Sequence, residues 1–177
     1  MTPRQSILIA FALAIAPALG GAGPAPAPAP EFTHAGAADW INSAQLTLKS
    51  LRGRVVLVEF WAFDCSNCLA SRAWLSGIER AKAAAGLTVI AVHTPELPEE
   101  RPAENVRAAV RRLGITGPVM LDADYSYWHA LDNAYWPAFY LIGRDGTLRG
   151  TAIGEMHRDT PAAQRLEQAI DSLLAAP

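Results

Sequence analysis

An apolar run that ends in a pair of cysteines constrains this chain more than any other feature. The segment 54–68 reads RVVLVEFWAFDCSNC, and residues 55–61 form an apolar stretch that contains one acid, Glu59. Such a stretch predicts a strand buried on both faces of a sheet. A helical pattern of apolar residues follows the second cysteine. Cys65 and Cys68, which are the only cysteines in the chain, therefore lie where a strand meets a helix.

The N-terminal part differs in composition from the rest of the chain. Residues 1–20 contain one charged residue, Arg4, then an apolar core and a small-residue ending, which is the pattern of a secretory signal peptide. A retained membrane anchor is less favoured, because the apolar core is shorter than the roughly 20 residues that span a bilayer. Residues 21–38 include alternating proline and alanine, which favours an extended linker. We therefore expect one globular domain at residues 39–177.

Composition limits the classes of partner. The chain has 177 residues, a formal net charge of −2 and interspersed charges, so we expect no nucleic-acid partner. A bridge between Cys65 and Cys68 would enclose only two residues, and a loop this short gives little entropic stabilisation. Redox chemistry is therefore a better reason than stability for an exported domain to carry this pair.

The remaining sequence alternates between strand and helix patterns. Residues 40–51 indicate a short N-terminal β-hairpin or edge strand, and Arg144-Asp-Gly146 indicates the turn of a second hairpin. The order predicts an α/β fold: a central mixed β-sheet flanked by helices, with an extra N-terminal hairpin and a helical insertion. We expect strands at 55–61, 87–92, 119–121, 138–142 and 148–153, and helices at 69–85, 102–113 (the insertion), 125–131 and 161–174.

The position of the cysteines predicts their chemistry. Cys65 should lie at the start of the helix, where free N–H groups and the helix dipole favour a thiolate, so we expect it to be the nucleophile. Cys68 lies one turn deeper and could resolve a mixed disulfide. Zinc sites use the same spacing but need two more ligands. The four histidines (34, 93, 129 and 157) show no paired spacing, so we expect neither a metal nor a cofactor.

The segment around the cysteines also resembles a known family. Val58-Glu-Phe-Trp-Ala62 followed by Cys65-x-x-Cys68 is similar to the active-site segment of thioredoxins. The resemblance covers about residues 39–174, and the insertion is typical of the TlpA/ResA-like branch of that superfamily. Four segments are also similar to the periplasmic thioredoxin-like domain of DipZ-type proteins, which join such a domain to a CcdA-like membrane electron carrier: 51–61, 92–96, 113–115 and 135–142.

The resemblance implies roles for three further residues. Glu59 takes the place of the buried acid of thioredoxins, which accepts and returns the proton of the buried thiol, and its burial would raise its pKa. The alternative is a strand-edge glutamate that reaches solvent. Pro137 takes the place of a cis-proline beside the dithiol, with Trp136 as a wall of the substrate groove. The alternative there is a trans-proline at an edge strand. Apart from the resemblance, His93 lies at the end of a predicted strand, where it would be a structural residue or would adjust protonation of the site.

These expectations lead to a thiol-disulfide oxidoreductase that is periplasmic or otherwise exported. Its partners would be disulfide-containing client proteins and a membrane electron donor of the CcdA type. Asp64 adds negative charge beside Cys65, and no basic residue lies between the cysteines, which favours the disulfide and thus a reductant. Two alternatives stay open. A peroxide-reducing redoxin usually has threonine or serine where this chain has Ala62. The other is a peptide- or copper-binding module of this fold, although copper carriers tend to use a cysteine spacing one residue longer.

Overall fold

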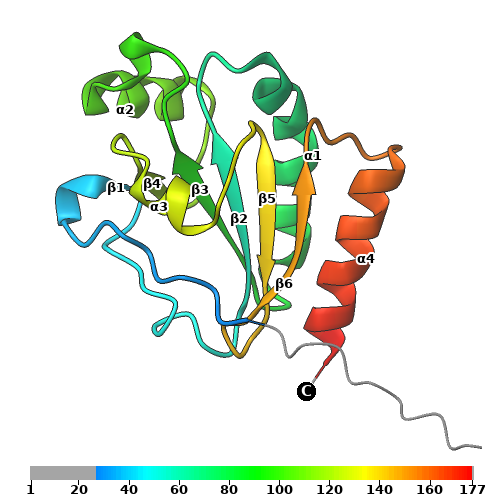
Figure 1. Cartoon of the computed structure of the whole chain (residues 1–177). Helices are drawn as coiled ribbons and strands as arrows, with labels where there is room; N and C mark the ends of the chain where they lie inside the picture. Colours follow the sequence, from blue (N-terminus) through cyan, green and yellow to red (C-terminus); the bar gives the residue numbers. More distant parts are fainter. Residues whose placement is uncertain (1–26, 177) are drawn as a thin grey trace, which may run out of the picture.

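The computed structural model describes residues 27–176, which form a six-stranded sheet with helices on both faces (Figure 1). The expected signal peptide, and the expected linker up to residue 26, lie outside the described residues. The elements are β1 (Trp40–Ile41), β2 (Val55–Trp61), α1 (Ser66–Lys82), β3 (Leu87–His93), α2 (Ala103–Arg112), β4 (Val119–Leu121), α3 (Ser126–Ala130), β5 (Ala138–Ile142), β6 (Leu148–Ile153) and α4 (Pro161–Ala175), with short 3-10 turns at Ala37–Asp39 and Pro98–Glu100.

The sheet is mixed, and β2 lies in its interior. The strand order is β1-β4-β3-β2-β5-β6. Strands β2, β3 and β4 run parallel, whereas β5 pairs antiparallel with β2 and β6, and β1 pairs antiparallel with β4. All seven residues of β2 are buried, as the apolar run predicts. Four strands have the bounds predicted from the sequence, and α2 is the predicted insertion between β3 and β4.

Each face of the sheet has its own covering layer. Val55 and Leu57 of β2 pack with residues of α1 and α4 on one face, where α2 also packs against β3 and β4. Val56, Val58 and Phe60 face the opposite side, which α3 and the segment before β2 cover. This alternation follows from the period of two along a strand. Within residues 27–176, no helix has both the length and the apolar character needed to cross a membrane.

The segment before β2 differs from its expected form. It does not form a hairpin: Trp40–Ile41 is a two-residue edge strand on β4, which was the alternative expectation, and residues 47–54 form hydrogen-bonded turns. The apolar spacing arises because Leu48 and Leu51 turn inward onto the sheet, where both are buried. Residues 27–38 also lie on the domain. Phe32 is buried in the same cluster, and the amide of Ala29 donates to the carbonyl of Gly146.

Candidate active site

Cys65 and Cys68 lie where β2 gives way to α1, and their sulfurs form a disulfide. Cys65 is the N-cap residue of α1, and its sulfur accepts a hydrogen bond from the amide of Cys68 at 3.2 Å. Cys65 is 7% exposed and Cys68 is fully buried. The predicted positions of both cysteines at the helix start, with Cys68 deeper, are therefore confirmed. Of the two cysteines, only Cys65 has any exposed surface through which an attacking group could approach.

The start of α1 also provides electrostatic support for a thiolate. The amides of the first turn have no partner within the helix, and one of them already points at the sulfur of Cys65. The first turn of α1 contains no acidic residue, and Arg80 and Lys82 lie in its last turn. On reduction, the dipole of this helix favours the anionic form of Cys65. The geometry is therefore suited to a nucleophilic thiolate at Cys65.

Glu59 is a fully buried acid in the middle of the sheet. It pairs with Ala91 of β3 and Phe139 of β5, so its predicted burial is confirmed and the alternative, a strand-edge glutamate that reaches solvent, is excluded. Its Oε2 accepts a hydrogen bond from Nη1 of Arg72 at 3.0 Å, and its Oε1 has no partner among the described residues. Burial raises the pKa of Glu59 from 4.5 to about 7, although Arg72 opposes the shift. A carboxyl with this pKa can accept or release a proton near neutral pH.

The peptide bond between Trp136 and Pro137 is cis, as predicted, and directly precedes β5. The indole Nε1 of Trp136 donates to the carbonyl of Thr94 at 3.0 Å, and its ring lies 4.2 Å from that of Trp128. Trp136 also packs against the apolar cluster that includes both cysteines. These contacts hold Trp136 against the cluster that contains the dithiol. Its role in binding substrate, and the contact of Pro137 with Cys65, stay predictions.

His93 ends β3 as a buried neutral side chain. It is 2% exposed, its ring lies 5.1 Å from that of Trp61, and its Nε2 has no partner among the described residues. Burial lowers the pKa of His93 from 6.5 to about 4. The imidazole therefore stays uncharged at neutral pH. This environment favours the structural interpretation of His93 over a role in proton exchange.

One buried acid near the dithiol has no counterpart in the sequence predictions. Glu100 is 1% exposed, and its carboxylate accepts the amide of Asp64, which directly precedes Cys65, at 2.9 Å. In the sequence Glu100 belongs to a proline- and glutamate-rich stretch that indicates an exposed loop. Its partner lies 36 positions away, so no local pattern in the sequence could have identified it.

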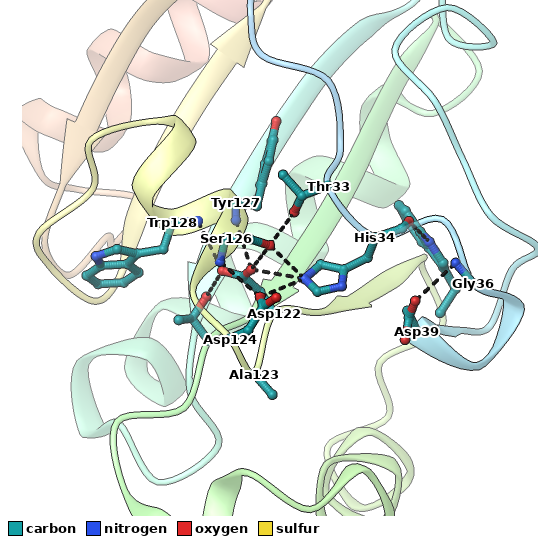
Figure 2. A network of polar contacts seen from close by, with 12 residues as sticks. Thr33, His34, Gly36, Asp39, Asp122, Ala123, Asp124, Ser126, Tyr127 and Trp128 are labelled. Atoms are coloured by element: carbon teal, nitrogen blue, oxygen red, sulfur yellow. Dashed lines mark hydrogen bonds and ion pairs between the residues drawn. The ribbon is translucent and has the colours of Figure 1, made fainter.

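A second polar network joins the segment before β2 to α3 (Figure 2). Nε2 of His34 lies 3.2 Å from an oxygen of Asp122 and 3.2 Å from one of Asp124, and the donor atoms of all three lie within 4.8 Å of one another, close enough to hold a metal ion. Both oxygens of Asp122 are nevertheless already bonded, to the amides of Tyr127 and Trp128. This network therefore anchors His34 and the start of α3 to each other.

Comparisons with known proteins agree with this geometry. The redoxin family profile matches residues 24–170. The chain is 43% identical to DipZ of Mycobacterium tuberculosis (strain CDC 1551 / Oshkosh) over 123 residues, which are 68% of this chain and 18% of DipZ. It is 29% identical to the thiol-disulfide oxidoreductase YkuV of Bacillus subtilis (strain 168) over 115 residues, 64% of this chain and 76% of YkuV.

The fold is likewise similar to solved structures. A thioredoxin-like protein in its oxidised form, solved in solution, superposes with a TM-score of 0.72 at 26% identity, over 85% of this chain and 96% of that one. The profile match covers most of the chain, and the matched part carries the Cys65–Cys68 disulfide at the start of α1. The chain therefore belongs to the redoxin family, and it is similar to thiol-disulfide oxidoreductases such as YkuV.

Proposed function

We propose that this protein is an exported thiol-disulfide oxidoreductase that reduces disulfides in client proteins. The observation that carries the proposal is the unequal exposure of the two bonded cysteines at the start of α1, 7% for Cys65 and none for Cys68. A dithiol oxidoreductase needs one sulfur that reaches the client and one that is kept from it until the mixed disulfide forms. The same arrangement gives no support to a purely structural bridge, because the enclosed loop is too short to stabilise the fold much.

The reaction has two exchange steps. In the reduced protein, the Cys65 thiolate attacks a client disulfide, forms a mixed disulfide and releases one client thiolate, which takes up a proton. Cys68 then loses its proton and attacks the sulfur of Cys65, which closes the Cys65–Cys68 bond and releases the second client thiolate. Two electrons pass to the client. Glu59 is the proposed acceptor of the Cys68 proton, because it is a buried acid with a pKa of about 7.

Client proteins are the proposed substrates because exposed apolar side chains lie on segments that adjoin the dithiol. The described residues expose four large hydrophobic side chains, and each is linked along the chain or by a backbone contact to the segments around the start of α1. Leu69 follows Cys68, Tyr135 precedes Trp136, Ile153 pairs with Ala138 beside the cis-proline, and Leu97 is tied to the loop before Cys65 through Glu100. Such a patch fits the apolar surface of a protein partner.

Trp136 and Pro137 are the proposed binding residues for an extended client segment. Trp136 packs against the cluster that holds both cysteines, and its indole is fixed by the carbonyl of Thr94. A rigid aromatic wall offers a large contact area at little entropic cost. The pattern of residues 1–20 supports export, after which a membrane electron donor of the CcdA type would restore the dithiol.

The direction of electron flow is tested by the redox potential of the Cys65/Cys68 pair in glutathione and dithiothreitol buffers. A reductant should give a value near or below about −250 mV, whereas a value near about −120 mV would identify an oxidant of folding proteins. Cys68→Ala should trap Cys65 in mixed disulfides with clients, and Cys65→Ala should trap none. A pair that cannot be cycled, with no trapped client, would overturn the proposal in favour of a peptide- or metal-binding module.

Export has its own test. The full chain should be processed near residue 20 and recovered outside the cytoplasm, and a variant that lacks residues 1–20 should stay inside. Recovery of both forms from the cytoplasm would contradict export while leaving the redox proposal intact.

A further inference from the structure

Glu100 joins two loops that leave neighbouring strands at the same edge of the sheet. β2 and β3 are parallel, with Trp61 opposite His93, so the loop that leads to Cys65 and the loop that follows His93 start side by side. The amide of Thr94 donates to the carbonyl of Trp61 at 3.1 Å and extends the ladder by one bond. Beyond this point no strand pairing holds the two loops together. The carboxylate of Glu100 lies between them.

Each carboxylate oxygen of Glu100 accepts hydrogen bonds from the backbone of one of the two loops. Oε1 accepts the amide of Asp64 at 2.9 Å, and Oε2 accepts the amides of Glu96 and Leu97 at 2.6 and 2.9 Å. The bonds to Glu96 and Leu97 cap the turn that Glu100 itself ends, which is an ordinary local role. The bond to Asp64 is different, because its partner is the residue next to Cys65 and lies in another loop. Capping the turn does not require the bond to the Asp64 amide.

We infer that Glu100 is a positioning residue for the dithiol, which fixes the backbone in front of Cys65 and adds a buried negative charge beside it. This inference rests on the proposed function, because it concerns the thiolate that the reaction uses. The bond to the Asp64 amide sets where α1 begins, and thereby where the sulfur of Cys65 lies. The charge acts on the same sulfur. Glu100 is 1% exposed, so salt and water screen its charge less than that of a surface acid such as Asp64.

The charge has a defined sign of effect. A negative group near Cys65 disfavours its thiolate, and whatever disfavours the thiolate favours the disulfide. Glu100 therefore makes the pair more reducing. This contribution opposes the dipole of α1, which favours the thiolate. Two fixed groups thus act in opposite directions on the stability of the Cys65 thiolate: the dipole of α1 and the Glu100 carboxylate in the loop that follows β3.

The test compares Glu100→Gln with Glu99→Gln. Glutamine has the size of glutamate but only one accepting oxygen, so it can accept amide hydrogen bonds from one loop and not from both. Glu99 is an exposed residue of the same turn. Its replacement removes the same formal charge and leaves the hydrogen bonds of the Glu100 carboxylate in place. The readouts are the equilibrium constant of the pair with glutathione, the thiolate titration of Cys65 in the reduced protein, and the melting temperature.

Glu100→Gln should shift the equilibrium constant about tenfold toward the dithiol, or about 30 mV less reducing, and should move the thiolate titration of Cys65 to lower pH. Glu99→Gln should leave both within about twofold of the wild type, because surface charges are screened. Equal constants and equal titrations for the two variants, with only a lower melting temperature for Glu100→Gln, would overturn the inference and leave Glu100 as a cap of its turn.

Hydrogen exchange on the wild type covers the case in which Glu100→Gln does not fold. Because one carboxylate accepts all three bonds, we expect the amides of Asp64, Glu96 and Leu97 to be protected together and to become exchangeable in one opening event. An Asp64 amide that exchanges at the rate of an unprotected peptide would overturn the inference. Failure of the proposed function is separable: the wild-type pair itself would then not cycle with glutathione, whatever the exchange pattern shows.

Discussion

Glu59, which is fully buried, and Arg72, whose side chain is 15% exposed, form an ion pair with 3.0 Å between Oε2 and Nη1, on the face of α1 that also carries Cys68. Arg72 follows Cys68 by four positions, so the two side chains lie one helical turn apart on the same face. The ion pair therefore connects the acid in β2 to the helix that begins at the dithiol. Burial and Arg72 act on the pKa of Glu59 in opposite directions, and burial has the larger effect. The pKa of about 7 is the net result.

Glu59→Gln should slow the resolving step. Glutamine cannot take the proton of Cys68, so the rate at which Cys68 resolves a mixed disulfide should fall by at least about tenfold. In the wild type this rate should rise with pH through about 7, the pKa of Glu59, and in the variant that step should be absent. Stopped-flow tryptophan fluorescence measures the rate. Glu104→Gln, an exposed acid on α2, is the control. A pH step that persists in Glu59→Gln would assign it to another group.

The same substitution should change the pH dependence of stability. The carboxyl of Glu59 has a pKa of about 7 in the folded protein against 4.5 in the unfolded chain. The unfolded chain therefore loses this proton first, and the wild type loses stability as the pH rises from about 4.5 to about 7. At about 1.4 kcal/mol per pKa unit the loss is on the order of 3 kcal/mol. Glu59→Gln lacks this loss, so its free energy of unfolding in urea, relative to that of the wild type, should rise across that window. A difference between the two free energies that is constant with pH would refute the shifted pKa.

Arg72→Met should move the pH step of the resolving rate upward. The charge and hydrogen bond of Arg72 lower the pKa of Glu59, so their removal leaves the effect of burial unopposed and raises this pKa above about 7. Methionine keeps the length and helix propensity of the side chain. Arg80→Met, an exposed position on the same helix, should leave the step where it is. The prediction fails if both variants give the wild-type profile in the stopped-flow experiment.

The elements that the sequence predicts well are those with a local cause. The apolar run of β2 and the Arg144-Asp-Gly146 turn between β5 and β6 led to strands with the observed bounds. Thr160 caps α4 by accepting the amide of Ala163, as serine and threonine do at helix starts. Cys65 is also predictable, because its position depends only on where one strand ends and one helix begins.

What the sequence does not predict depends on distant residues. The bond of Glu100 to Asp64 spans 36 positions and that of His34 to Asp122 spans 88. No periodicity encodes such contacts, because they exist only after the strands have assembled. The hairpin predicted in 40–51 failed for a related reason. The leucines of this segment belong to turns that pack onto the sheet. The apolar pattern alone does not distinguish such turns from a strand.

His93→Phe should reduce the loss of stability in acid. Burial lowers the pKa of His93 to about 4 from 6.5. As the pH falls, the unfolded chain is protonated first, so the wild type loses stability between about pH 6.5 and 4, by on the order of 3 kcal/mol. Phenylalanine cannot be protonated and suits the neighbouring Trp61 and Phe63 rings. Urea unfolding across this window should show a smaller loss for the variant. His129→Phe, at an exposed position, should follow the wild type.

Trp136→Ala should impair the reduction of proteins more than that of small disulfides. If Trp136 is a wall of the client groove, its removal should lower kcat/KM for a protein disulfide about tenfold, mainly through KM, as truncation of an aromatic anchor does. Glutathione disulfide, which needs no groove, should react within about twofold of the wild-type rate. Trp136→Phe keeps the ring but loses the bond to the Thr94 carbonyl, so its effect should be intermediate. Equal losses for both substrates, or a changed redox potential, would mean that Trp136 supports the dithiol itself and does not bind clients.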